Sequence, residues 1–182
     1  MPHPANNDAR EIVSASVVVA GGGVIGKALA LALHHRSRGT VSVAIAEPRA
    51  PRPPSSGRAY AITTASRALL MEIGVWPKLE ASVQPVREMR ITDSRLQDPV
   101  RQALLTFEAS EEPLAHIVDE GDLLFTLSDE LQAARIPAIA AGVTARHAGA
   151  AGLELQLSDG RRLRAALLAA ADGAGSPCRE MA

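Results

Sequence analysis

Three glycines near the N-terminus have the spacing of a phosphate-binding loop. Gly21, Gly23 and Gly26 fit the pattern G-x-G-x-x-G within the stretch SASVVVAGGGVIGKALALAL. In this pattern the first glycine permits a tight turn, the second lets backbone approach a pyrophosphate, and the third lets a helix pack closely on a strand. The N–H groups at the start of the following helix then point at the anion. The spacing therefore predicts a dinucleotide site at residues 21–26.

The residue predicted to bind the sugar of that dinucleotide is Glu47. It ends a second apolar run, residues 41–47, and follows Gly26 by 21 residues. A carboxylate at this place accepts hydrogen bonds from the ribose hydroxyls of an adenosine. Because its charge would repel a 2′-phosphate, the sequence favours FAD or NAD over NADP at this site. The glycines themselves do not distinguish FAD from NAD.

The same residues allow two other interpretations. Residues 21–27 match the start of a nucleoside-triphosphatase loop, G-x-x-x-x-G-K, but that motif continues with a Ser or Thr that binds magnesium, and this chain has Ala28. Lys27 is therefore expected to face solvent near the start of the helix. The remaining alternative is structural, in which the glycines only pack a helix against a sheet.

The elements around the glycines predict a strand–helix–strand unit. Residues 14–20 are short, β-branched and apolar, as in a buried parallel strand, and residues 24–35 have a helical pattern. Residues 41–47 are the second strand, and such units have a right-handed crossover. The proline-rich residues 48–57 are predicted to form a loop.

The rest of the chain predicts further helices and strands. Helices are predicted over residues 63–76, with a stop at Gly74, and 119–134, and strands over residues 86–92, 103–107 and 137–143. Residues 86–107 are expected to belong to a smaller and more exposed sheet. Residues 143–173 carry three strands, and their turns predict an antiparallel meander that leads back into the main sheet.

Composition narrows the class of protein. The net charge of −1 argues against a nucleic-acid partner, which would normally require a basic excess. The single cysteine, Cys178, allows no intramolecular disulfide, and no apolar run reaches the ~20 residues of a membrane span. Residues 1–13 lack the basic start and apolar core of a signal peptide and are expected to be a disordered lead-in. A cytoplasmic protein is the expectation.

Two longer stretches resemble a family of flavin enzymes. Residues 56–93, SGRAYAITTASRALLMEIGVWPKLEASVQPVREMRITD, resemble the segment after the second strand in FAD-dependent aromatic hydroxylases of ubiquinone biosynthesis. These form the 2-octaprenyl-6-methoxyphenol hydroxylase group of the p-hydroxybenzoate-hydroxylase-like flavin monooxygenases. Residues 170–179, AADGAGSPCR, are similar to the second fingerprint of that superfamily, an Asp-Gly pair after a buried strand. Gly23 and Asp172 lie 149 residues apart, and the resemblance covers nearly the whole chain.

The resemblance implies an α/β fold. The expectation is a Rossmann-like FAD/NAD(P)-binding domain with a mainly parallel sheet, helices on one face and an antiparallel β-meander on the other. Residues 14–182 would be the N-terminal part of this domain, with residues 84–118 contributing strands of an incomplete substrate-binding sheet. The family's third fingerprint, a Gly-Asp pair, does not occur between Asp172 and Ala182, so we expect an N-terminal portion of a longer enzyme.

The resemblance also implies the cofactor contacts. It assigns the FAD pyrophosphate to the glycine loop, namely Gly21, Gly23, Val24, Ile25 and Gly26. Glu47 would bind the adenosine ribose, and Arg58 would approach the flavin side of the cofactor. Val143 would lie beside the adenine. Asp172 would lie near the pyrophosphate, where the family also places the NAD(P)H electron donor.

Several of these residues have a simpler interpretation. The alternative for Arg58 is a solvated arginine that ends a loop, and the alternative for Asp172 is a cap on a short helix beginning at Gly175. Arg49 and Arg52 are expected to be solvated. The sequence shows no set of residues at metal-ligand spacing and no acid–base pair, so no metal is expected and the catalytic residues stay unassigned.

The resemblance implies that the complete enzyme uses NAD(P)H and O2 to hydroxylate a phenolic ring, that of a ubiquinone precursor. This chain is expected to bind FAD weakly through its ADP half and to be inactive alone. Contact with the inner membrane surface or with a ubiquinone-synthesis complex is expected, as is self-association through exposed edges. Two alternatives stay open, which are a piece of an NAD-dependent dehydrogenase and a non-catalytic assembly module.

Overall fold

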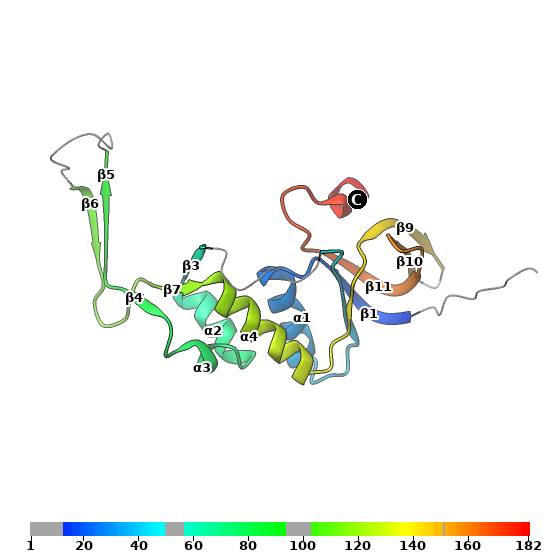
Figure 1. Ribbon diagram of the computed structural model, residues 1–182, viewed down its shortest axis with the longest axis horizontal. Helices are drawn as coiled ribbons and strands as arrows, with labels where there is room; N and C mark the ends of the chain where they lie inside the picture. The colour runs from blue at the N-terminus through cyan, green and yellow to red at the C-terminus, as the bar shows by residue number, and fades with distance from the viewer. Residues whose placement is uncertain (1–12, 50–56, 94–102, 151) are drawn as a thin grey trace, which may run out of the picture. The chain divides into compact units, whose positions relative to one another are not determined.

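The computed structural model describes residues 13–49, 57–93, 103–150 and 152–182, which fall into two compact units (Figure 1). The first unit combines Met1–Arg52 with Leu127–Ala182, and the second is Pro53–Thr126. Except for Val13, the predicted lead-in lies outside the described residues. The same holds for residues 50–56 of the predicted proline-rich loop.

The first unit is built on a six-stranded sheet with the order β8-β2-β1-β11-β10-β9. Its strands are β1 (Val13–Ala20), β2 (Val43–Ala46), β8 (Ala138–Ile139), β9 (Val143–Gly149), β10 (Gly152–Leu157) and β11 (Arg162–Ala170). The first four strands in this order pair in parallel, and β11, β10 and β9 pair antiparallel as a meander. The predicted meander and its return to the main sheet are confirmed.

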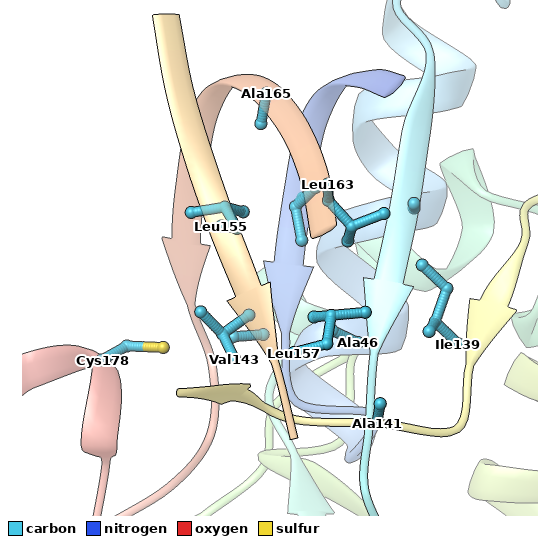
Figure 2. Close-up of a cluster of buried hydrophobic side chains, with 12 residues drawn as sticks. Ala46, Ile139, Ala141, Val143, Leu155, Leu157, Leu163, Ala165 and Cys178 are labelled. Carbon is cyan, nitrogen blue, oxygen red and sulfur yellow. The ribbon is translucent and has the colours of Figure 1, made fainter. Parts of the chain in front are cut away.

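Alternating residues of the central strands give the sheet two apolar faces. Helix α1 (Val24–Arg36) packs against β1 and β2. On the other face, Val18 and Ala46 join a buried cluster with Leu155 and Leu157 of the meander, so the meander folds over the sheet (Figure 2). Because both faces are covered, all four residues of β2 are apolar and buried, as is usual for parallel sheets. This confirms the predicted α/β fold with a meander on one face.

The second unit contains two small antiparallel sheets, one with the order β3-β7-β4 and one of β5 and β6. Its elements are β3 (Ala59–Ile62), α2 (Thr64–Glu72), α3 (Trp76–Leu79), β4 (Gln84–Val86), β5 (Glu88–Thr92), β6 (Ala103–Glu108), β7 (Ala115–Asp119) and the start of α4 (Glu120–Ala133). Trp76 is buried, lies edge-on to the His116 ring at 5.1 Å, and carries the Arg67 guanidinium 5.3 Å from its ring centre.

The structure differs from the sequence prediction mainly in the second unit. Strands β3 and β7 were not predicted, because three of the four residues of β3 are exposed and its apolar signal is weak. The predicted helix stop at Gly74 is confirmed, since α2 ends at Glu72 and the φ of +77° at Gly74 ends the helical path before α3 begins. Among the described residues, no helix is long and apolar enough to cross a membrane.

Candidate cofactor site

The predicted site residues follow three neighbouring strands of the large sheet. β2, β1 and β11 are parallel, so their carboxyl ends reach the same edge. The Gly21 N–H donates to the Ala46 carbonyl at 2.8 Å, and the Ala171 N–H donates to the Ala20 carbonyl at 2.7 Å. The glycine loop, Glu47 and Asp172 therefore leave the sheet side by side, where ligands bind in open α/β sheets.

The glycine loop needs two of its glycines for steric reasons. Gly21 has a φ of +107°, and a Cβ there would overlap the carbonyl oxygen of Ala171, so the loop lies directly against the chain that precedes Asp172. A Cβ on Gly26 would overlap the carbonyl oxygen of Gly21. The third glycine of the motif thus lets the helix close onto the loop itself.

The start of α1 is open to an anion. Gly23 is the N-cap residue, no side chain caps the helix, and a Cβ on Gly23 would meet no atom of the chain within 4 Å. The first N–H groups of a helix have no partner within it, and they carry the positive end of its dipole. Val24 is half-buried and Ile25 is 73% exposed. The loop has the open cradle that a pyrophosphate requires, so the residues present fit FAD.

Glu47 is tied to the loop and to its own chain. Its Oε2 accepts the Gly22 N–H at 2.7 Å, and the Arg49 backbone N–H and Nε both donate to Oε1 at 2.9 Å. Burial alone would raise the pKa of this carboxyl, but the hydrogen bonds from Arg49 and Gly22 lower it to about 2. Glu47 is therefore a permanent anion near neutral pH.

Asp172 supports a turn of the chain, which is the simpler of its two interpretations, and its cofactor contact stays a prediction. Its Oδ2 accepts the backbone N–H of Cys178 at 3.1 Å, in the first turn of the short helix α5 (Pro177–Glu180), whose N-cap is Ser176. Burial alone would raise the pKa of Asp172, but hydrogen bonds from Ser176 and Cys178 lower it. The other oxygen, Oδ1, is buried and has no hydrogen-bond partner among the described residues. One oxygen of this carboxylate therefore supports the turn, and the other is buried without a partner among the described residues.

A cavity of about 120 Å³ joins these groups. Its lining includes Gly21, Glu47, Arg49, Val143 and Asp172, which come from four separate parts of the chain. A larger hollow of about 610 Å³ also has Asp172 in its lining. The structure therefore brings Gly21, Glu47, Val143 and Asp172 together, as the predicted site requires.

Arg58 and Lys27 lie in different surroundings. Arg58 is exposed and belongs to the second unit, where its carbonyl accepts the Glu120 N–H at 3.0 Å, and its cofactor contact stays a prediction. The expectation that Lys27 faces solvent is wrong, because its Nζ donates to Ser128 Oγ of α4 at 2.6 Å. Burial lowers the pKa of Lys27, and the charge of Glu47 opposes this effect.

Arg49 was also missed by sequence reasoning. Its side chain is 61% exposed, as expected of a solvated residue, yet its Nη2 donates to Glu47 Oε2 at 3.1 Å in addition to the bonds from Nε and the backbone. The spacing of two residues between a strand-end acid and an arginine was the available signal.

Comparison with known proteins agrees with this geometry. The FAD binding domain family matches residues 14–182. Ubiquinone hydroxylase UbiL of Rhodospirillum rubrum is 33% identical over 173 residues, covering 92% of this chain and 39% of that protein. The 3-demethoxyubiquinol 3-hydroxylase of Escherichia coli is 32% identical over 178 residues, covering 91% and 43%. The chain spans about two fifths of the length of these relatives.

Solved structures share the fold. The flavin-dependent monooxygenase PieE, crystallised with FAD and substrate, superposes with a TM-score of 0.71 at 18% identity and covers 93% of this chain and 32% of its own. FqzB superposes with a TM-score of 0.72 at 20% identity, covering 92% and 37%. At these identities the likeness concerns the fold alone.

Proposed function

Because the chain belongs to the FAD binding domain family of flavin monooxygenases and is homologous to ubiquinone hydroxylases, we propose that it holds the ADP half of FAD. The observation that carries this proposal is the meeting of the glycine loop, Glu47 and Asp172 around one cavity, beside a helix start that is open at Gly23. This arrangement supports a dinucleotide with an adenosine and a pyrophosphate.

Each residue of the cradle has a proposed role. The N–H groups of the glycine loop and the first turn of α1 would hold the pyrophosphate; this assigns Gly21, Gly23, Val24, Ile25 and Gly26. Glu47 would accept the ribose hydroxyls, and Val143 would lie against the adenine. Asp172 would hold a donor near the pyrophosphate with its unpartnered oxygen, and Arg58 would contact the flavin side.

The proposed reaction of the complete enzyme is hydroxylation of a phenolic ring. FAD, when bound, would supply the redox chemistry, which is acceptance of electrons from NAD(P)H and activation of O2. The residues of this chain orient the cofactor and hold its charge in place. The two relatives, a ubiquinone hydroxylase and a 3-demethoxyubiquinol 3-hydroxylase, favour a ubiquinone precursor as substrate. Such a lipid-soluble substrate would bring the enzyme to the cytoplasmic face of the inner membrane or into a ubiquinone-synthesis complex. We expect this chain alone to bind FAD without catalysing hydroxylation.

The test is a calorimetric titration of the chain with FAD, NAD and ATP, with bound flavin followed by its absorbance at about 450 nm. Saturable binding of FAD well ahead of NAD and ATP supports the proposal. Equal affinity for NAD would favour the dehydrogenase alternative. Binding of none of the three would contradict a preformed cradle and favour an assembly module.

A pair of variants makes the test specific to the site. Glu47→Gln removes the charge that accepts the ribose hydroxyls and should weaken FAD binding about tenfold, since hydrogen bonds to charged groups are worth ~1.5–3 kcal/mol. Glu154→Gln is the matched control, because Glu154 also bonds an arginine, Arg162 at 3.1 Å, and does not line the cavity. An equal loss in both variants would contradict the role of Glu47.

A further inference from the structure

The Glu47 carboxylate already accepts four hydrogen bonds. One comes from the Gly22 N–H, one from the Arg49 backbone, and two from the Arg49 guanidinium. A carboxylate offers about four lone-pair sites. The donors of the chain therefore occupy the acceptor positions that the ribose hydroxyls would need on Glu47.

Of these four donors, the guanidinium is the one that can leave. Gly22 is held against Glu47, since a Cβ on Gly22 would lie 2.9 Å from both Cβ and Cγ of Glu47. The Arg49 backbone N–H is fixed two residues along the chain. The Arg49 side chain is 61% exposed, whereas that of Glu47 is 17% exposed. The guanidinium is therefore the donor that another anion can reach from solvent, and the one that can exchange Glu47 for it.

The surroundings of Arg49 indicate where it would go. The cavity is lined by two carboxylates, Glu47 and Asp172, and Arg49 is the one cationic side chain among the described residues that line it. The charge of Asp172 acts on Arg49 and contributes to raising its pKa, after the larger effect of Glu47. A pyrophosphate placed near two carboxylates requires a cation beside the open helix start.

We propose that Arg49 changes partners when the dinucleotide binds, with its guanidinium leaving Glu47 to the ribose hydroxyls and pairing with the pyrophosphate. The inference rests on the proposed function, because it requires that an adenosine diphosphate group occupy this site. It assigns Arg49 two roles, as an internal substitute for the ribose in the empty site and as a phosphate ligand in the filled one.

The test separates the ribose from the phosphates. Binding of adenosine and of ADP to the full chain is measured by nuclear magnetic resonance titration for the wild type and for Arg49→Ala. Adenosine should bind the variant about two- to fivefold more tightly, because the competing ion pair is gone. The ratio of ADP affinity to adenosine affinity should fall about tenfold, which corresponds to about 1.4 kcal/mol.

The matched control is Arg161→Ala. Arg161 also pairs with an acid two residues earlier, donating its backbone N–H to Asp159 at 3.0 Å and its Nε at 2.7 Å, and it does not line the cavity. This control should leave both affinities unchanged. Thermal unfolding of both variants checks that the fold is retained, as expected for an exposed side chain.

A second measurement follows the exchange directly. The Nε–H signal of Arg49, identified by its loss in Arg49→Ala, should move on addition of ADP to a position different from the one it takes with adenosine. If Arg49→Ala weakens adenosine and ADP equally, or changes neither, the exchange is wrong while the binding site stands. If the wild type binds neither ligand, the proposed function fails and the exchange with it.

Discussion

The large sheet and the β5–β6 ribbon place apolar side chains in opposite surroundings. All four residues of β2 are buried, whereas every residue of β5 and β6 is exposed. In the ribbon, Met89 lies opposite Phe107 and Ile91 lies opposite Leu105, so these four side chains share one exposed face. A two-stranded ribbon alone is marginally stable in water.

The difference in burial between β2 and the ribbon depends on which other elements cover each of them. β2 is buried because α1, which immediately precedes it in the chain, and the meander, which is distant in sequence, cover its two faces. In the ribbon, β5 and β6 pair with each other in a regular antiparallel register. Within the described residues, no helix or second sheet covers either face of the ribbon. We therefore infer that the stability of this chain resides in the large sheet, and that the apolar residues of the ribbon contribute little to it.

The largest effect is expected from a matched pair of leucines. Leu155 of the meander is 0% exposed, and Leu155→Ala should lower the free energy of unfolding by about 2–5 kcal/mol through lost packing and a cavity. Leu105 of the ribbon is 48% exposed, and Leu105→Ala should change it by less than about 0.5 kcal/mol. Urea unfolding measures both. Equal losses would break the comparison and indicate a ribbon that is packed in solution.

A smaller effect is expected where the sheet meets the glycine loop. Gly26→Ala places a methyl group against the Gly21 carbonyl and should destabilise the chain by about 1–3 kcal/mol, with loss of FAD affinity. Gly23→Ala is the control for stability only, because its φ of −75° suits alanine and its Cβ would meet no other part of the chain, so the fold should be retained while the added methyl group obstructs the proposed pyrophosphate. Thermal unfolding and FAD titration compare the two. A stable Gly26→Ala chain that binds FAD normally would contradict the close contact.

The smallest effect concerns two Glu–Arg ion pairs of the same spacing, one on the large sheet and one on the ribbon. Glu47 and Arg49 pair at the edge of the large sheet, and Glu88 and Arg90 pair with the same spacing on the ribbon. The folded pKa of Glu47, about 2, lies below its ordinary value of 4.5. Its stabilising contribution is therefore present above about pH 4.5 and is lost as the pH falls toward 2.

The variants Glu47→Gln and Glu88→Gln test this difference. The free energy of unfolding is measured by urea unfolding between pH 7 and pH 2. The values for the wild type and for Glu47→Gln should converge as the pH falls. Glu88→Gln should follow the wild-type curve at every pH, because the pair on the ribbon is exposed to solvent. A parallel course of wild type and Glu47→Gln would show that the Glu47 carboxylate is not held by its neighbours.

The parts of the fold that sequence reasoning predicted depend on local patterns. The apolar run of β1, the glycine spacing and the turns of the meander each fix their structure within a few residues, and the structure confirms these elements. The missed features depend on distant partners. Lys27 bonds Ser128, which is 101 residues away, and β3 forms only by pairing with β7. The pairing of Arg49 with Glu47 is local instead, and the spacing of two residues was a signal for it.

The position of β1 affects how the chain folds during synthesis. β1 leaves the ribosome long before β11, yet the two strands are neighbours in the sheet, with Ser14 paired to Arg164. At about 5–20 residues per second, a nascent chain would wait on the order of 10 s between these two strands. During that time one edge of β1 stays unpaired, and contacts so distant in sequence form slowly. The nascent N-terminal segment is therefore the part of this chain that a chaperone would have to protect.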